Sequence, residues 1–209
     1  MIRDGVGSAI YWTGLVGSVA IRHRATRRLT QRAESVRAVD DSPMRRAPDR
    51  PCVTFGQILW TLAQAAAVVR TFSSALEFAE YRIFPLWRAT GAVGFVASLF
   101  VLWRAHRDLG HHWDHRLAIH GEHQLVTTGI YRYVRHPLYA AYWLWSLSLV
   151  LLLPNWLIGP VSIVGFALVY YGRVDREERL LKDQFGAAYE QYSRQTNRLV
   201  PRMCHKRSE

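Results

Sequence analysis

Two groups of charged side chains flank the longest apolar run in the chain, and both contain residue types that bind carboxylates and other anions. Arg135 and His136 precede this run, and Arg173 follows it with Glu177 four residues further on. Residues four apart share one face of a helix, so Arg173 and Glu177 could serve one ligand or form an ordinary ion pair. Arginine can orient a carboxylate through two parallel hydrogen bonds. The alternative for Arg135 is an anchor of membrane topology, because basic residues are enriched beside spanning helices.

The apolar run predicts a helical hairpin that brings these two groups together. Residues 138–171 contain no charged side chain, and Pro154-Asn155 interrupts them near the middle. A spanning helix needs roughly 20 apolar residues, so the run indicates two short antiparallel helices joined by a tight turn. Pro137 suits the first turn of the first helix, whose N-terminus favours anions. Both ends of an antiparallel hairpin lie on the same side, where they could form one pocket.

Three apolar segments upstream complete a predicted all-α, polytopic membrane protein with about five transmembrane helices. They cover residues 5–21, 53–69 and 83–103. The last segment has small residues at Gly91 and Gly94, which allow a neighbouring helix to pack closely. For the first segment a secretory signal peptide is the alternative, although it lacks a clear basic region and a convincing cleavage site.

The distribution of basic residues predicts which side of the membrane carries the pocket. Residues 22–52, 104–137 and 173–209 hold 23 of the 27 arginines and lysines. The five-helix arrangement places all three segments on one side if the N-terminus is outside, and an excess of basic residues marks the cytoplasmic side. The anionic cytoplasmic leaflet then accounts for the net charge of +11, and no nucleic-acid-binding motif accompanies that charge.

Two further segments are expected on the cytoplasmic side. Residues 22–52 are rich in arginine and predict a mobile loop on anionic lipid. From Arg173 onward, apolar residues recur every three or four positions, which predicts an amphipathic helix that is broken near Gly186 and could cover the pocket. We therefore divide the chain into N-terminal membrane helices with a basic loop (1–82) and a membrane core with the candidate pocket (83–209).

Neither the histidines nor the cysteines predict a metal site. His111, His112, Asp114 and His115 have neither the spacing of a His-Glu-x-x-His helix nor a paired-cysteine motif. The two cysteines of the chain are too few and too distant in sequence for a disulfide framework. We expect histidines in a solvated loop at the membrane interface instead.

The charged groups also carry a resemblance to a known family. The stretch HQLVTTGIYRYVRHPLY (residues 123–139), the apolar hairpin and the stretch RVDREERLLKDQFGAAYEQY (residues 173–192) together resemble the isoprenylcysteine carboxyl methyltransferase family of integral-membrane enzymes, which is related to phospholipid N-methyltransferases. The resemblance covers roughly residues 103–201. It implies transfer of a methyl group from S-adenosylmethionine to a lipid or lipid-like acceptor at the cytoplasmic membrane face, with carboxylate O-methylation favoured.

The resemblance also assigns site residues by position. Arg173 would be the catalytic residue that faces the methyl acceptor. One departure is Ala141, which stands where the family commonly has glycine. The cofactor site would be formed by His123, Gln124, Leu125, Val126, Tyr131, His136, Pro137, Leu138, Tyr139 and Glu177.

The chemistry of methyl transfer fits this set of residues. A sulfonium methyl group is already electrophilic, so the enzyme mainly aligns the reactants and excludes water, without a metal or a nucleophilic side chain. A carboxylate acceptor needs no general base. An amine acceptor would need one, and Glu178 or His136 would be the candidates.

Two other functions compete with this prediction. A membrane reductase of the sterol-reductase type has a similar C-terminal helical layout and would use a nicotinamide cofactor, NADPH. A non-catalytic scaffold would use its basic loops to bind anionic lipid or a protein partner. The spacing between HQLVTTGIY and RHPLY, together with the Glu177-Glu178 pair, favours the methyltransferase. The expected partners are membrane lipids and a lipid-like or prenylated acceptor, without nucleic acid.

Overall fold

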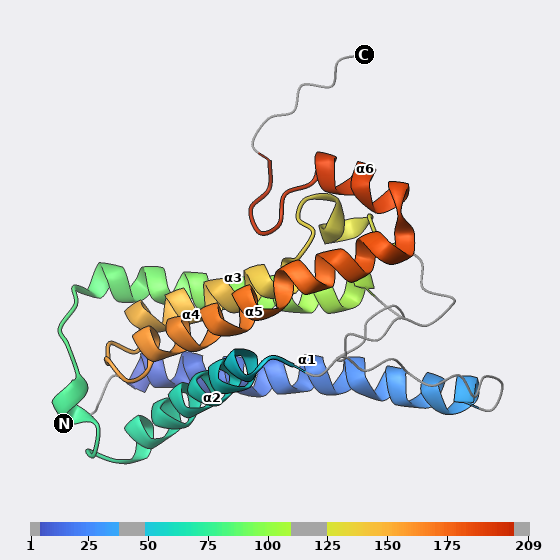
Figure 1. Cartoon of the computed structure of the whole chain (residues 1–209). Coiled ribbons are helices and arrows are strands. Elements are labelled where there is room, and N and C mark those ends of the chain that lie inside the picture. Colours follow the sequence, from blue (N-terminus) through green and yellow to red (C-terminus); the bar gives the residue numbers. More distant parts are fainter. Residues whose placement is uncertain (1–4, 38–48, 110–124, 203–209) are drawn as a thin grey trace.

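The computed structural model describes residues 5–37, 49–109 and 125–202, and these ranges are predominantly helical (Figure 1). Within them, β pairing is limited to two isolated bridges. Two short 3-10 helices connect the longer elements, η1 (Glu77–Ala79) and η3 (Gly129–Arg132). The α-helices are α1 (Gly5–Arg37), α2 (Pro51–Phe72), α3 (Pro85–Leu109), α4 (Pro137–Leu152), α5 (Gly159–Phe185) and α6 (Ala187–Gln195).

Helices α4 and α5 form the hairpin that the apolar run predicts. They pack against each other, and residues 153–158 join them. The buried side chain of Asn155 holds this turn, because its Nδ2 donates to the carbonyl of Leu76 at 2.9 Å and its Oδ1 accepts from the amide of Leu157 at 3.0 Å. A side chain that bonds its own backbone two residues on is typical of asparagine in turns.

The small residues of α3 allow a neighbouring helix to pack closely, as predicted, and that helix is α4. A Cβ atom added at Gly91 would lie 2.6 Å from the backbone nitrogen of Leu152, and one at Gly94 would lie 2.5 Å from Oγ of Ser148. Real Cβ atoms essentially never approach other atoms this closely. At Gly91 the close atoms include backbone, so the two helices can pack at this distance only because that position lacks a side chain.

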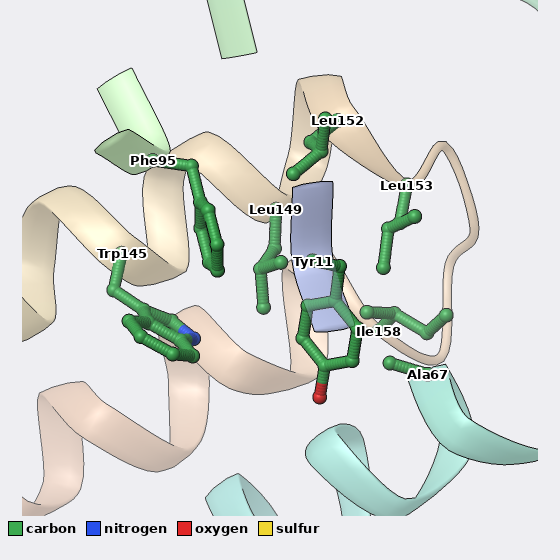
Figure 2. Packing of buried hydrophobic residues seen from close by; sticks show 8 residues of the cluster. All are labelled: Tyr11, Ala67, Phe95, Trp145, Leu149, Leu152, Leu153 and Ile158. Atoms are coloured by element: carbon green, nitrogen blue, oxygen red, sulfur yellow. The ribbon is translucent and has the colours of Figure 1, made fainter. Parts of the chain in front are cut away.

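Buried residues from α1, α2, α3 and the hairpin form a shared core (Figure 2). The core also contains a buried amide, Gln64, whose Oε1 accepts hydrogen bonds from Tyr11 Oη at 3.3 Å and Trp145 Nε1 at 3.2 Å. Its Nε2 donates to Oγ of Ser162 at 3.4 Å. Hydrogen bonds of this kind link helices where water is absent. They attach the N-terminal pair α1 and α2 to the rest of the bundle.

The described parts of the three basic segments lie towards one end of the bundle, on the right in Figure 1, where α1, α3 and α5 end. Helices α2 and α4 begin nearer the middle of the view and run away from that end. The hairpin turn, the end of α2 and the start of α3 lie at the opposite end, where Arg70 pairs with Glu80 at 2.9 Å. Among the described residues, α2 and α3 are long and apolar enough to cross a membrane, and α4 is a shorter apolar helix. The count of five spans stays a prediction.

The expectation of a mobile loop at residues 22–52 is wrong for its first half. Helix α1 continues to Arg37 and is 33 residues long. Residues 22–37 contain arginine, alanine, glutamine and glutamate but no glycine or proline. These are good helix formers, so an existing helix can extend through them even though they are highly charged. Residues 38–48 lie outside the part of the chain that the structure describes.

Candidate active site

The start of α4 places His136 and Tyr139 next to the end of α5. Pro137 occupies the first turn of α4, as predicted, and His136 is the residue immediately before the helix. The side chain of His136 is buried, and its Nε2 lies 3.1 Å from Oε1 of Glu178. Its Nδ1 lies 3.9 Å from Oε2 of Glu177. The two charged ends of the hairpin therefore meet, which confirms that an antiparallel hairpin brings them together.

A short hydrogen bond joins Tyr139 to Glu177 across the hairpin. The hydroxyl of Tyr139 donates to Oε1 of Glu177 at 2.5 Å. Burial raises the pKa of the Glu177 carboxyl, although the hydrogen bond from Tyr139 and the nearby positive groups oppose this rise. The ring of Tyr139 also packs edge-on against Tyr170, with 5.4 Å between the ring centroids. Oε2 of Glu177 lies 3.9 Å from Nδ1 of His136, which is beyond hydrogen-bond distance.

Arg173 pairs with a residue from outside the hairpin rather than with Glu177. Its Nε donates to Oδ1 of Asp49 at 3.0 Å, and its Nη2 donates to Oδ2 of the same carboxylate. Asp49 lies two residues before α2. The structure therefore does not contain the ion pair between Arg173 and Glu177 that was the simpler interpretation of their spacing.

Glu178 is the most highly connected carboxylate in this region. Arg135 donates to its Oε1 from Nε at 3.1 Å and from Nη2 at 2.8 Å. Arg198 donates to its Oε2 from Nε at 3.1 Å and from Nη2 at 2.7 Å. Burial opposes ionisation of Glu178, but the hydrogen bonds from His136, Arg198 and Arg135 outweigh it and lower the pKa of this carboxyl. A carboxylate held in this way is a poor proton acceptor, so the suggestion that Glu178 could serve as a general base is not favoured.

The C-terminal segment docks onto the start of α4 through Arg135. Nη1 of Arg135 donates to the carbonyls of Ser193 and Thr196. The backbone amides of Arg135 and His136 donate to the carbonyls of Asn197 and Arg198 at 2.8 and 2.9 Å. The tail thus covers this side of the site, as its amphipathic pattern predicts. The sequence left Arg135 open between a topology anchor and a wall of the pocket, and the structure makes it the residue that fixes the tail.

The expected break near Gly186 is confirmed. Helix α5 ends at Phe185, Gly186 has a φ of 50°, and α6 begins at the next residue. A positive φ is costly for residues other than glycine, so this position allows the chain to change direction. In α6, Tyr189 and Tyr192 are buried, and the hydroxyl of Tyr192 donates to the carbonyl of Tyr131 at 2.6 Å.

Asp108 at the end of α3 holds the segment that contains Tyr131. Oδ2 of Asp108 accepts from the amide of Ile130 at 2.7 Å and from Nε of Arg104 at 2.8 Å. Gly129 has a φ of 61°, and a Cβ atom there would lie 2.2 Å from this carboxylate oxygen. The predicted close turn at Gly129 is therefore present. The sequence analysis did not identify Asp108 as the residue that holds this turn. The only local signal for Asp108 is that it follows Arg104 by four residues, the spacing of an ion pair within a helix.

Most of the predicted site residues fall within described ranges. Tyr131, Pro137 and His136 are buried, whereas Leu125, Val126 and Leu138 are partly exposed. Ala141 is buried as well, so the structure accommodates its methyl group. Residues 110–124 lie outside the described part of the chain, and with them His111, His112, Asp114, His115, His123 and Gln124. Among the described residues, no cluster of three or more histidine, cysteine, aspartate or glutamate side chains could hold a metal ion.

Comparison with known proteins identifies the family. The model of the isoprenylcysteine carboxyl methyltransferase family matches residues 91–183, which include α4 and most of α5. A probable protein-S-isoprenylcysteine O-methyltransferase of Oryza sativa subsp. indica is 30% identical over 148 residues, which are 68% of this chain and 75% of the relative. The chain belongs to the isoprenylcysteine carboxyl methyltransferase family.

Other members support this assignment. Protein-S-isoprenylcysteine O-methyltransferase A of Arabidopsis thaliana is 32% identical over 162 residues, which are 71% of this chain and 79% of the relative. The solved structure of a eukaryotic intramembrane Ras methyltransferase of the family has the same fold, with a TM-score of 0.53 and 23% identity. The match covers 75% of this chain and 54% of that chain, so this protein spans about half the length of its structural neighbour.

Family membership implies a methyl donor, and the site has groups that suit one. The Glu177 carboxylate is of the type that accepts hydrogen bonds from hydroxyl or amino groups, and Tyr139 already donates to one of its oxygens. The aromatic ring of Tyr139 lies beside it, and aromatic rings attract a cationic centre such as a sulfonium. Asp49, the partner of Arg173, lies outside the residues that the family model matches, whereas Tyr139, Arg173 and Glu177 lie within them.

Proposed function

We propose that the protein transfers a methyl group from S-adenosylmethionine to the carboxylate of a lipid-like acceptor, an isoprenylated cysteine, at the cytoplasmic face of the membrane. The observation that carries this proposal is the 2.5 Å hydrogen bond between Tyr139 and Glu177. It joins the two ends of the hairpin within the segment that the family model matches. The names of the relatives supply the substrate class.

In this proposal, some residues where the two ends of the hairpin meet bind the methyl donor, and Arg173 binds the methyl acceptor. Glu177 accepts hydrogen bonds from the ribose or the amino group of the donor, and Arg173 orients the acceptor carboxylate. When bound, S-adenosylmethionine supplies an electrophilic methyl group. The remaining cofactor residues are His123, Gln124, Leu125, Val126, Tyr131, His136, Pro137, Leu138 and Tyr139, of which the first two lie outside the described part of the chain.

The proposed reaction needs no proton transfer. A carboxylate attacks without losing a proton, so no side chain has to serve as a general base. The low pKa of Glu178 agrees with this, since a carboxyl that holds its negative charge among two arginines and a histidine is poorly suited to receive a proton. An amine acceptor would have required a base in this position.

The proposed membrane arrangement has the apolar parts of α1 to α5 as spans, the N-terminus outside and the active site in the cytoplasm. Two features support it. The described parts of the basic segments lie towards the same end of the bundle as the candidate site, and an excess of arginine and lysine is typical of the cytoplasmic side. An acceptor with an isoprenyl chain would then reach the site from the bilayer.

Cofactor binding and turnover test the proposed function directly. Calorimetry on the detergent-purified protein should show binding of S-adenosylmethionine or its demethylated product. Transfer of radiolabelled methyl groups to N-acetyl-S-farnesylcysteine should follow, and the methyl ester of this probe is the matched control because it has no free carboxylate. Absence of S-adenosylmethionine binding would contradict the proposal, and binding of NADPH in its place would favour a reductase.

A further inference from the structure

Asp49 occupies the guanidinium group that the proposed acceptor would need. We propose that the Asp49 carboxylate is an internal competitor of the substrate, which the acceptor carboxylate displaces from Arg173 and which returns to Arg173 after methylation. This inference rests on the proposed function, because it assigns a second ligand to the same arginine. The competing residue, Asp49, lies outside the segment that the family model matches.

The contact uses the geometry that recognises a carboxylate. Nε and Nη2 of Arg173 donate in parallel to the two oxygens of Asp49. Two parallel hydrogen bonds from guanidinium to carboxylate are the arrangement that makes arginine specific for carboxylate ligands. The two side chains are 22% and 28% exposed, so water screens this pair less than a fully exposed one. An acceptor carboxylate that uses the same edge of Arg173 has to replace Asp49.

Packing of α2 on α5 places Asp49 beside Arg173. Val53 in the first turn of α2 is fully buried, and its Cγ2 lies 2.4 Å from where a Cβ atom at Gly172 would stand. The amide of Val53 donates to the carbonyl of Arg50 at 2.9 Å, which continues the helical turn back towards Asp49. Since Gly172 immediately precedes Arg173, the same close contact that joins the helices positions the competing carboxylate.

The charge change of the reaction explains why the competition would reverse. Methyl transfer breaks the bond between the methyl carbon and the donor sulfur and forms a bond between that carbon and a carboxylate oxygen. The sulfonium becomes a neutral thioether and the carboxylate becomes a neutral ester, without release of a proton. An ester cannot form the ion pair with Arg173, whereas Asp49 still can. Asp49 would therefore favour release of the product.

The alternative is that Asp49 only anchors the start of α2. Kinetics of Asp49→Asn separate the two roles, because asparagine keeps the shape of the side chain and removes its charge. With N-acetyl-S-farnesylcysteine as acceptor, loss of the competitor should lower KM by about three- to fivefold, as expected for a partly exposed ion pair. The inhibition constant of the methyl ester product should also fall, because Asp49 no longer competes with it, and Asp49→Glu should keep a KM close to that of the wild type.

Asp183→Asn is the matched control, since it makes the same charge change at an exposed position of α5 and should leave KM unchanged. Asp49→Ser provides a second variant without the charge if Asp49→Asn folds poorly. An unchanged or higher KM in both variants, with normal turnover by the wild type, would overturn the role of Asp49 alone. No turnover by the wild type would overturn the proposed function and this inference with it.

Discussion

Glu177 and Arg173 lie one helical turn apart but have different partners, and this difference divides their proposed roles. Glu177 bonds Tyr139 on α4, whereas Arg173 bonds Asp49 before α2. We expect Glu177→Ala to weaken S-adenosylmethionine binding about tenfold or more, because a charge-assisted hydrogen bond to the ligand is lost. Arg173→Ala should leave this affinity nearly unchanged and reduce turnover.

Calorimetry with the cofactor and a methyl-transfer assay measure the two effects separately. Glu177→Gln is a useful intermediate variant, since it retains an acceptor oxygen but loses the charge. An equal loss of cofactor affinity in Glu177→Ala and Arg173→Ala would contradict the division of roles.

Glu178 gives a prediction about stability and pH. Its pKa is lowered in the folded protein, so its ion pairs stabilise the fold fully above the unfolded pKa of about 4.5. This stabilisation is lost as the pH falls from there through the folded-state pKa. We expect Glu178→Gln to reduce the free energy of unfolding by about 2 kcal/mol at neutral pH, because Arg135 and Arg198 lose a charged acceptor.

Thermal unfolding in detergent between pH 7 and pH 3 checks this prediction. The difference between the wild type and Glu178→Gln should shrink below pH about 4.5 and stay constant above it. Glu190→Gln is the comparison variant, since Glu190 forms an exposed pair with Lys182 and such pairs contribute little. A difference that grows as the pH falls would contradict the assigned partners of Glu178.

At the scale of elements, the contact between α3 and α4 depends on the absence of side chains. A Cβ atom at Gly91 would lie 2.6 and 2.7 Å from atoms of Leu152 and Leu151. We expect Gly91→Ala to lower the free energy of unfolding by about 1–3 kcal/mol, the usual cost of overpacking. Because Tyr139 lies in α4 and His136 immediately precedes this helix, the same change should weaken cofactor binding.

Gly17→Ala is the matched control for this contact. Gly17 also lies inside a helix, but a Cβ atom there would have no neighbour within 4 Å. Alanine should therefore stabilise α1 by about 0.5–1 kcal/mol, since it restricts the unfolded chain more than glycine does. Thermal unfolding of both variants distinguishes a local packing effect from a general effect of helical propensity. Similar shifts in both would contradict the proposed close packing.

At the scale of the whole molecule, the two ends of the bundle differ in charge and in chemistry. The candidate site and the described parts of the basic segments lie towards one end, and the connection between α2 and η1, which contains Ser74, lies at the other. We expect the site end to be cytoplasmic. A membrane-impermeant maleimide should therefore label Ser74→Cys on intact cells in a background without Cys52 and Cys204. Exposed Cys52, as the single cysteine, should react only after the membrane is permeabilised; the reverse pattern would contradict the orientation.

The amino-acid sequence by itself determined the features that depend on local patterns. Its uncharged run interrupted by Pro154-Asn155 predicts the hairpin, because apolar length sets the spans and a proline ends the first of them. The glycine at position 129 predicts the close turn, and Pro137 predicts the start of α4. The sequence also predicts that His136 and Glu177 lie close together, because the start of the first helix and the end of the second are neighbours in an antiparallel hairpin.

Only the tertiary structure decided which charged groups pair with one another. Glu178 binds Arg135 and Arg198, and Asp49 binds Arg173 across 124 positions of sequence. Sequence spacing within one helix suggested Glu177 as the partner of Arg173, but a long arginine side chain can reach several carboxylates. The choice among them depends on how α2 and the C-terminal segment pack against α5, and that packing arises from contacts between residues that are distant in the chain. Local periodicity contains no information about such contacts.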